Sequence, residues 1–238
     1  MITPGAPGAP GAPGALRLPT VAFRALIAAA AVTGLVIECV YGSVPVVLSF
    51  FTIWTNILVA VVFGLSAYRV QRREPDVAPF WRGGVLLFIL ITGLVFHLVL
   101  ANPSSPFNVL EDLDKLSGAK AVSNQLLHTV TPVGAVLDFL FLTAPRTLRP
   151  RYAAQWLAYP LLYVAFALTR GALLSPGVPS RYTYPFIDAA QYGYARVALN
   201  AVVLGLAFYA LGLALVAADR YRPPRENRIS SPAEGPLK

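Results

Sequence analysis

Residues 84–101 read GVLLFILITGLVFHLVLA, a run without a single Asp, Glu, Lys or Arg. A helix of about 20 apolar residues crosses the hydrocarbon core of a bilayer. Comparable runs lie near residues 21–41, 47–68, 122–143, 153–174 and 195–218. Because unpaired backbone groups cannot face lipid, each run is predicted to be helical. The sequence therefore predicts an all-α polytopic membrane protein with six transmembrane helices.

The composition supports this class and excludes others. Hydrophobic residues make up 56% of the 238 residues and charged residues 13%, and the mean hydropathy is +0.62. A soluble domain carries roughly twice that charged share, so the balance excludes a disordered chain, a nucleic-acid-binding module and an ordinary cytosolic enzyme. The single Cys39 excludes a disulfide framework or a cysteine metal site within one chain. No metal site and no cofactor are expected.

The basic residues predict the orientation. The net charge is +8, and the basic residues gather in loops between the apolar runs rather than in a nucleic-acid-binding patch. Most of the 19 Lys and Arg residues face the cytoplasm if the N-terminus is cytoplasmic, whereas the 102–120 loop on the other side carries Glu111, Asp112 and Asp114. The positive-inside rule therefore predicts that both termini are cytoplasmic.

Three regions follow along the chain. Residues 1–16 hold a Gly-Ala-Pro repeat that we expect to be a disordered tail. Residues 17–219 form the predicted membrane domain, and residues 220–238 a basic cytoplasmic tail. Pro132 and Pro160 lie inside the fourth and fifth runs, where each removes a backbone donor and predicts a kink. The Pro-, Ala- and Arg-rich composition is typical of a high-GC bacterium, which indicates a bacterial plasma membrane.

Polar side chains at membrane depth are costly, and they usually face the interior of a helix bundle. Asp138 lies towards the inner end of the fourth helix. In the predicted orientation the other polar residues fall in the outer leaflet: Glu38, Thr52, Thr55, Asn56, His97, Asn124, His128, Arg170, Arg196 and Asn200. This grouping predicts a shared polar cavity in the outer leaflet.

Spacing alone leaves the role of these residues open. Thr52, Thr55 and Asn56 share one helix face, but hydroxyls in membrane helices also bond to their own backbone or hold helices together. Asn124 and His128 lie one turn apart, and a buried histidine satisfied by a neighbour is common. Two histidines on adjacent helices are also compatible with axial haem ligation, although no attachment motif accompanies them.

The remaining polar groups have structural interpretations. Glu38 and Arg170 are predicted to neutralise one another, with snorkelling of Arg170 and Arg196 to the headgroups as the alternative. The tyrosines between the fifth and sixth runs are typical of an interfacial aromatic belt. They are Tyr182, Tyr184, Tyr192 and Tyr194.

Three short elements carry a family resemblance. FFTIWTN at 50–56 followed by LVAVVF at 58–63, NQLLHTVTP at 124–132 and YPF at 184–186 resemble the androgen-induced/androgen-dependent family of integral membrane proteins. Animal members of that family are multi-pass lipid hydrolases that cleave fatty acid esters of hydroxy fatty acids with a membrane-embedded threonine and a histidine. The resemblance implies that Thr52 is the nucleophile and His128 the base. The chain differs from those members in its Gly-Ala-Pro tail, its 102–120 loop and its Thr55-Asn56 pair, so the substrate is open.

The resemblance predicts a coherent chemistry. A histidine at hydrogen-bonding distance activates a hydroxyl as nucleophile, and it then protonates the leaving alcohol. Helical spacing suggests that Asn124 orients His128 and that Asn56 or Thr55 donates to the oxyanion. Glu38, His97 and Arg170 complete the candidate set. The expected partners are membrane lipids and a lipid ester. The alternative is a non-catalytic lipid-binding or scaffold protein, or a small transporter.

Overall fold

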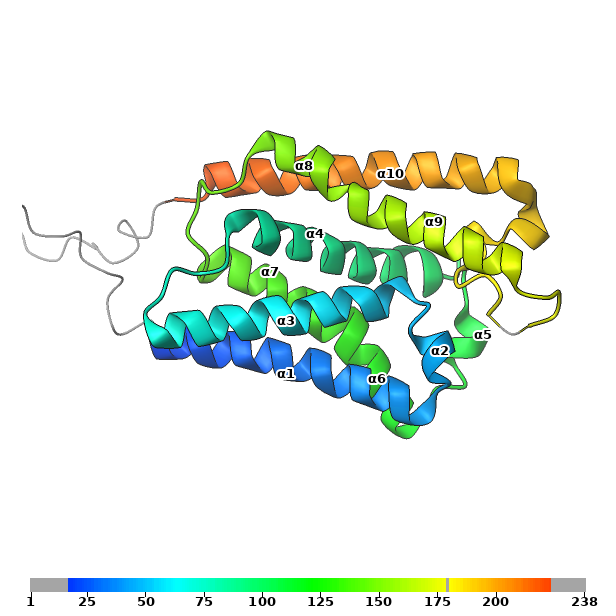
Figure 1. Cartoon of the computed structure of the whole chain (residues 1–238), viewed down its shortest axis with the longest axis horizontal. Helices are drawn as coiled ribbons and strands as arrows, with labels where there is room; N and C mark the ends of the chain where they lie inside the picture. The colour runs from blue at the N-terminus through cyan, green and yellow to red at the C-terminus, as the bar shows by residue number, and fades with distance from the viewer. Residues whose placement is uncertain (1–16, 179, 224–238) are drawn as a thin grey trace, which may run out of the picture.

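The computed structural model describes residues 17–178 and 180–223, so the predicted tail at 1–16 and most of the tail at 220–238 lie outside the described residues (Figure 1). No strand occurs in these ranges. The elements are α1 (Arg17–Tyr41), α2 (Val44–Val47), α3 (Phe51–Arg72), α4 (Pro79–Val95), the π-helix η2 (Phe96–Leu100), α5 (Leu110–Leu113), α6 (Gly118–Gln125), the π-helix η3 (Leu126–Val130), α7 (Thr131–Phe141), α8 (Pro150–Trp156), α9 (Ala158–Leu173), the 3₁₀ helix η4 (Pro185–Ile187) and α10 (Ala189–Tyr221).

Five helical stretches in the described part of the chain are long and apolar enough to cross a membrane. They are Arg17–Tyr41, Phe51–Arg72, Pro79–Leu100, Pro150–Leu173 and Ala189–Tyr221. The all-helical fold that the sequence predicts is therefore confirmed, and the long apolar helices are compatible with a membrane protein. The remaining predicted run, 122–143, lies in a continuous helical stretch formed by α6, η3 and α7, which covers residues 118–141 and is not among the five.

Prolines account for two interruptions of the predicted spans. Pro132 cannot donate to the carbonyl of His128 four residues earlier, and the π-helical turn η3 lies at this point. Pro160 likewise cannot donate to the carbonyl of Trp156, where α8 ends. Each interruption falls one turn before its proline.

The helices form a bundle with α4 between two groups (Figure 1). On one side lie α1, α3 and α7, and on the other α8, α9 and α10. The η3 turn packs closely against α1 and α4. A Cβ on Gly34 would lie 2.5 Å from the Leu127 side chain, and one on Gly93 would lie 3.0 Å from Pro132. Both glycines therefore let the helix that carries His128 approach its neighbours.

The two ends of the bundle differ. At the end where α1 begins and α10 ends, here called the terminal end, Arg24 is 1% exposed. Its Nε lies 2.7 Å from Oδ1 of Asp138, and one terminal nitrogen lies 2.8 Å from both Asp76 and Ser66. Asp76 also contacts Ser66 and Arg82. This cluster ties α1, α3, α4 and α7 together.

Two arginines of the cluster are parts of helices. Arg24 lies inside α1, and Arg82 lies in the first turn of α4. Burial acts against the charged form of Asp76, which lies in the loop before α4. Arg82, Ser66 and Arg24 nevertheless hold the pKa of that carboxyl below its ordinary value of 3.8. Asp76 is therefore a carboxylate at neutral pH.

Candidate functional site

The candidate site lies at the opposite end of the bundle, here called the distal end, where α3 begins (Figure 1). Thr52 occupies the first turn of α3 and is 7% exposed. Its Oγ1 lies 3.1 Å from Nε2 of His128, which η3 carries. The residues are 76 positions apart in the sequence. The structure thus brings together the threonine and the histidine that the resemblance singled out.

The hydrogen bonds of His128 determine which of its ring nitrogens carries the hydrogen. Its Nδ1 lies 3.1 Å from the backbone carbonyl of Asn124, one turn earlier. A carbonyl only accepts hydrogen bonds, so in the neutral imidazole Nδ1 carries the hydrogen and Nε2 is the free acceptor that faces Thr52. The Phe96 ring stacks on the imidazole with the centroids 4.2 Å apart. The contact that holds the imidazole therefore comes from the Asn124 main chain and not from its side chain.

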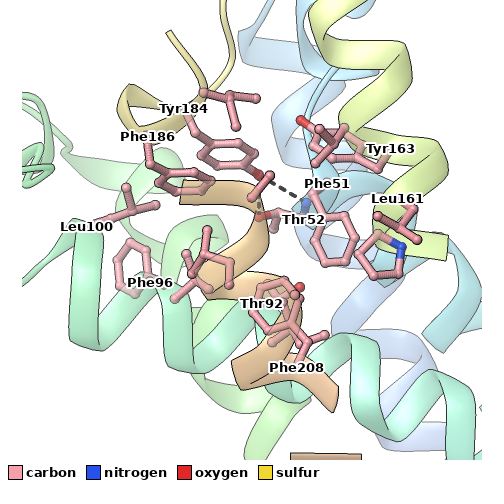
Figure 2. A pocket seen from close by; sticks show the side chains of 18 of the residues that line it. Phe51, Thr52, Thr92, Phe96, Leu100, Leu161, Tyr163, Tyr184, Phe186 and Phe208 are labelled. Atoms are coloured by element: carbon pink, nitrogen blue, oxygen red, sulfur yellow. Dashed lines mark hydrogen bonds between the residues drawn. The ribbon is translucent and has the colours of Figure 1, made fainter. Parts of the chain in front are cut away.

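Tyr184 is the third member of the site. Its hydroxyl lies 3.4 Å from both the backbone nitrogen and Oγ1 of Thr52 (Figure 2). Burial raises the pKa of the Tyr184 hydroxyl above its ordinary value of 10, so the phenol keeps its proton at neutral pH. The Thr52 amide belongs to the N-terminus of a 22-residue helix, where amide hydrogens and the helix dipole favour negative charge.

The expected oxyanion donors have other partners. The Asn56 side-chain nitrogen donates to the carbonyls of Thr52 at 2.9 Å and Leu127 at 3.2 Å, while its oxygen accepts from Thr131 at 2.8 Å. Thr55 turns to the Tyr159 hydroxyl, 3.5 Å away. Asn56 therefore fastens α3 to the helix of His128, and the groups that lie beside Thr52 Oγ1 are its own amide and Tyr184.

The other candidates lie further from Thr52. His97 is exposed, and its Nε2 lies 3.1 Å from the Thr129 hydroxyl rather than facing His128. The predicted pairing of Glu38 with Arg170 is wrong. Glu38 bonds to Lys120 and to Ser123, whereas Arg170 donates to the carbonyls of Ser180 and Arg181 in the loop after α9. Arg170 therefore shapes the loop that leads to Tyr184.

Two cavities meet at the site. One, of about 110 Å³, is lined almost wholly by apolar side chains from α3, α4, η2, α9 and α10. The other, of about 500 Å³, lies under the distal loops and includes Glu38, Lys120 and Asn124 in its lining. Thr52, Phe96, Leu100, His128 and Tyr184 line both cavities. In Figure 2 the labelled side chains surround Thr52, with Tyr184 and Phe186 on one side and Phe208 on the other.

Tyr184 and Phe96 were not among the residues expected at the site. Tyr184 was expected in an aromatic belt, although YPF is one of the elements that carry the resemblance. In the structure the Asn200 side chain donates to the Phe186 carbonyl at 2.9 Å, which holds this segment over the site. The signal was present in the sequence, but its position in a loop pointed to the membrane interface.

Among residues 17–178 and 180–223, no group of three or more His, Cys, Asp and Glu side chains could hold a metal ion. The chemistry that Thr52, His128 and Tyr184 offer is that of a hydroxyl with an adjacent base and two nearby donors.

The chain was also compared with known proteins. No protein family, curated protein or solved structure matches it.

Proposed function

We propose that this chain is an intramembrane hydrolase of lipid esters, with Thr52 as nucleophile and His128 as general base. The observation that carries the proposal is the 3.1 Å contact between Thr52 Oγ1 and the free acceptor nitrogen of His128. It lies where an apolar cavity meets a larger one that also holds charged and amide groups. The resemblance to the androgen-induced/androgen-dependent family supports the same two roles.

The reaction proceeds in two steps, acylation of Thr52 and hydrolysis of the acyl-threonine. His128 Nε2 takes the proton of Thr52 as Oγ1 attacks the ester carbonyl, and the carbonyl electrons move to its oxygen. When that intermediate collapses, the bond to the alcohol oxygen breaks and His128 returns the proton to the leaving alcohol. A water molecule, deprotonated by His128, then attacks the carbonyl carbon of the acyl-threonine. As this second intermediate collapses, the bond between the acyl carbon and Oγ1 breaks and His128 returns the proton to Oγ1. The products are a free acid and the regenerated Thr52 hydroxyl.

The oxyanion of this reaction is stabilised by the Thr52 amide and the Tyr184 hydroxyl. Both groups lie beside Oγ1, and in the resting protein they contact one another. A developing negative charge at the N-terminus of α3 is also favoured by the helix dipole.

We also propose a membrane topology for the chain. α6, η3 and α7 together form the sixth membrane span, so that both termini are cytoplasmic and the site lies in the outer leaflet of a bacterial plasma membrane. Two observations support this arrangement. α1 begins and α10 ends at the same end of the bundle. Arginines gather at that end, in and around the loop before α4 (Arg69, Arg72, Arg73 and Arg82) and in the loop before α8 (Arg146 and Arg149). A lipid substrate then reaches Thr52 from the membrane.

The test is ester hydrolysis by detergent-purified protein with a panel of long-chain lipid esters. Thr52→Ala and His128→Ala each have a matched control in this chain. Thr55→Ala removes a buried threonine one turn along α3 that faces Tyr159, and His97→Ala removes the exposed histidine that faces Thr129. We expect turnover to fall about a thousandfold or more in the first pair and to stay near wild type in the controls.

Each variant must unfold near the wild-type temperature for the comparison to count. Equal turnover in all four variants, or no turnover in a folded wild type across the panel, would refute the hydrolase proposal. Loss of thermal stability without loss of specific activity in Thr52→Ala would favour a structural role for the pair.

A further inference from the structure

The two cavities that meet at Thr52 differ in the chemistry of their linings. The smaller one contains Thr52 and His128 at one end and is otherwise formed by side chains such as Ile91, Val95 and Phe208. The larger one holds charged and amide groups from the distal loops. An ester consists of an acyl part and an alcohol part on either side of the carbonyl that the nucleophile attacks. With Thr52 at the junction, one part can lie in each cavity.

The size of the apolar cavity limits what it can enclose. It holds about 110 Å³. An engineered apolar cavity of ~150 Å³ accepts a benzene molecule, so this one encloses at most about six carbons. A longer acyl chain must therefore continue beyond the cavity.

The boundary between α9 and α10 provides a path for the rest of the chain. Leu161 of α9 lines the cavity and is 61% exposed, so this wall faces the outside of the bundle. On α10 the lining residues recur on one helical face: Ala201, Leu204, Gly205 and Phe208. Gly205 has an open neighbourhood, because an added Cβ would meet no atom within 4 Å.

We infer that the apolar cavity holds the first carbons of the acyl chain, and that the remainder leaves between α9 and α10 into the lipid, past Gly205. The alcohol part of the ester occupies the larger cavity. This inference rests on the proposed function and adds the direction in which the substrate lies. Gly205 is then the residue that keeps the path open for long chains.

The experiment compares one alcohol with two acyl chains. Purified protein is assayed with para-nitrophenyl butanoate and para-nitrophenyl hexadecanoate, and the ratio of the two kcat/KM values is measured for wild type, Gly205→Leu and Ala207→Leu. Ala207 is exposed on the same helix and does not line the cavity, so Ala207→Leu adds a similar side chain on the lipid side. If Gly205→Leu does not fold, Ala201→Leu replaces it, one turn earlier on the cavity face.

We expect the hexadecanoate-to-butanoate ratio to fall about tenfold in Gly205→Leu, a difference of about 1.4 kcal/mol in activation free energy, because the added side chain occupies the path that the longer acyl chain needs. The ratio stays at the wild-type value in Ala207→Leu. An unchanged ratio in folded Gly205→Leu overturns the inference.

If the wild type hydrolyses neither ester, the panel of lipid esters decides the proposed function, and a binding measurement decides the inference by itself. Radiolabelled hexadecanoic acid is titrated against wild type and Gly205→Leu. Binding by wild type that is lost in the variant supports the acyl path. Equal binding by both proteins, or none by wild type, overturns it.

Discussion

Arg24 at the terminal end and Thr52 at the distal end are both buried polar residues, but their surroundings are opposite. Arg24 is ionised and contacts two carboxylates and a hydroxyl, and the adjoining cavity holds only about 30 Å³, room for little more than a water molecule. Thr52 has uncharged partners and borders two cavities of about 110 and 500 Å³.

The difference shows what each end is built to do. Burying an ion is costly unless it is paired, so a charge cluster without room for a ligand serves to hold helices in place. Neutral hydroxyl and imidazole groups beside a cavity have hydrogen-bonding capacity that a ligand can use. Polarity at membrane depth is therefore a poor guide to function until the space around it is known.

The largest expected effect is a loss of stability when the charge cluster at the terminal end is broken. Arg24→Met leaves the carboxylates of Asp76 and Asp138 without their shared partner, and we expect a loss of about 3–5 kcal/mol in the free energy of unfolding. Chemical unfolding in detergent measures it. Arg17→Met, at the half-buried start of the same helix, removes a single long hydrogen bond to the Gln71 carbonyl. It is the control and should change stability by less than about 1 kcal/mol. A wild-type unfolding curve for Arg24→Met would remove the distinction between the ends.

A smaller effect is expected in catalysis at the distal end. Tyr184→Phe removes one of the two donors beside Thr52 and should lower kcat for lipid esters about a hundredfold, with KM and the unfolding temperature close to wild type. Tyr192→Phe is the matched control, because Tyr192 lines neither cavity. If Tyr184→Phe turns over like wild type, the oxyanion is stabilised elsewhere.

The smallest expected effect is on the way that stability depends on pH. The folded-state pKa of Asp76 lies below its ordinary value of 3.8, so its stabilising contribution is complete above that value and is lost as the pH falls through the folded pKa. Unfolding temperatures measured from pH 7 to about pH 3 should therefore fall more steeply for wild type than for Asp76→Asn. Parallel curves for the two proteins would show that Asp76 does not contribute.

Hydropathy was sufficient to locate the long helices, because the length of an apolar run is a local property of the chain. It did not reveal that Arg24 lies in a buried cluster, since its partners Asp138 and Asp76 are 114 and 52 residues away. Nor did it separate Glu38 from Arg170, which share a predicted depth but bond to different segments. Long-range pairing depends on how the helices are arranged around one another.

In the candidate site, too, local features could be predicted from the sequence and long-range contacts could not. Thr52 and His128 were found through short sequence elements, and the Asn124 to His128 contact follows from one helical turn. The misassignment of Asn56 had another cause. Its spacing from Thr52 is right for a neighbour, but its amide nitrogen donates to the carbonyl of Thr52 in its own helix and to that of Leu127 in the adjacent one. Spacing indicates which residues are near, whereas competing partners decide which remain free.

The π-helical turn at Leu126–Val130 has a consequence for how such a site can change. An α-helix advances about 100° per residue, so one residue gained or lost in this turn rotates everything on one side of it by about that angle. A single-residue deletion there would turn His128 away from Thr52 without altering either side chain. The chain thus contains a point at which one codon, gained or lost, assembles or dismantles the pair.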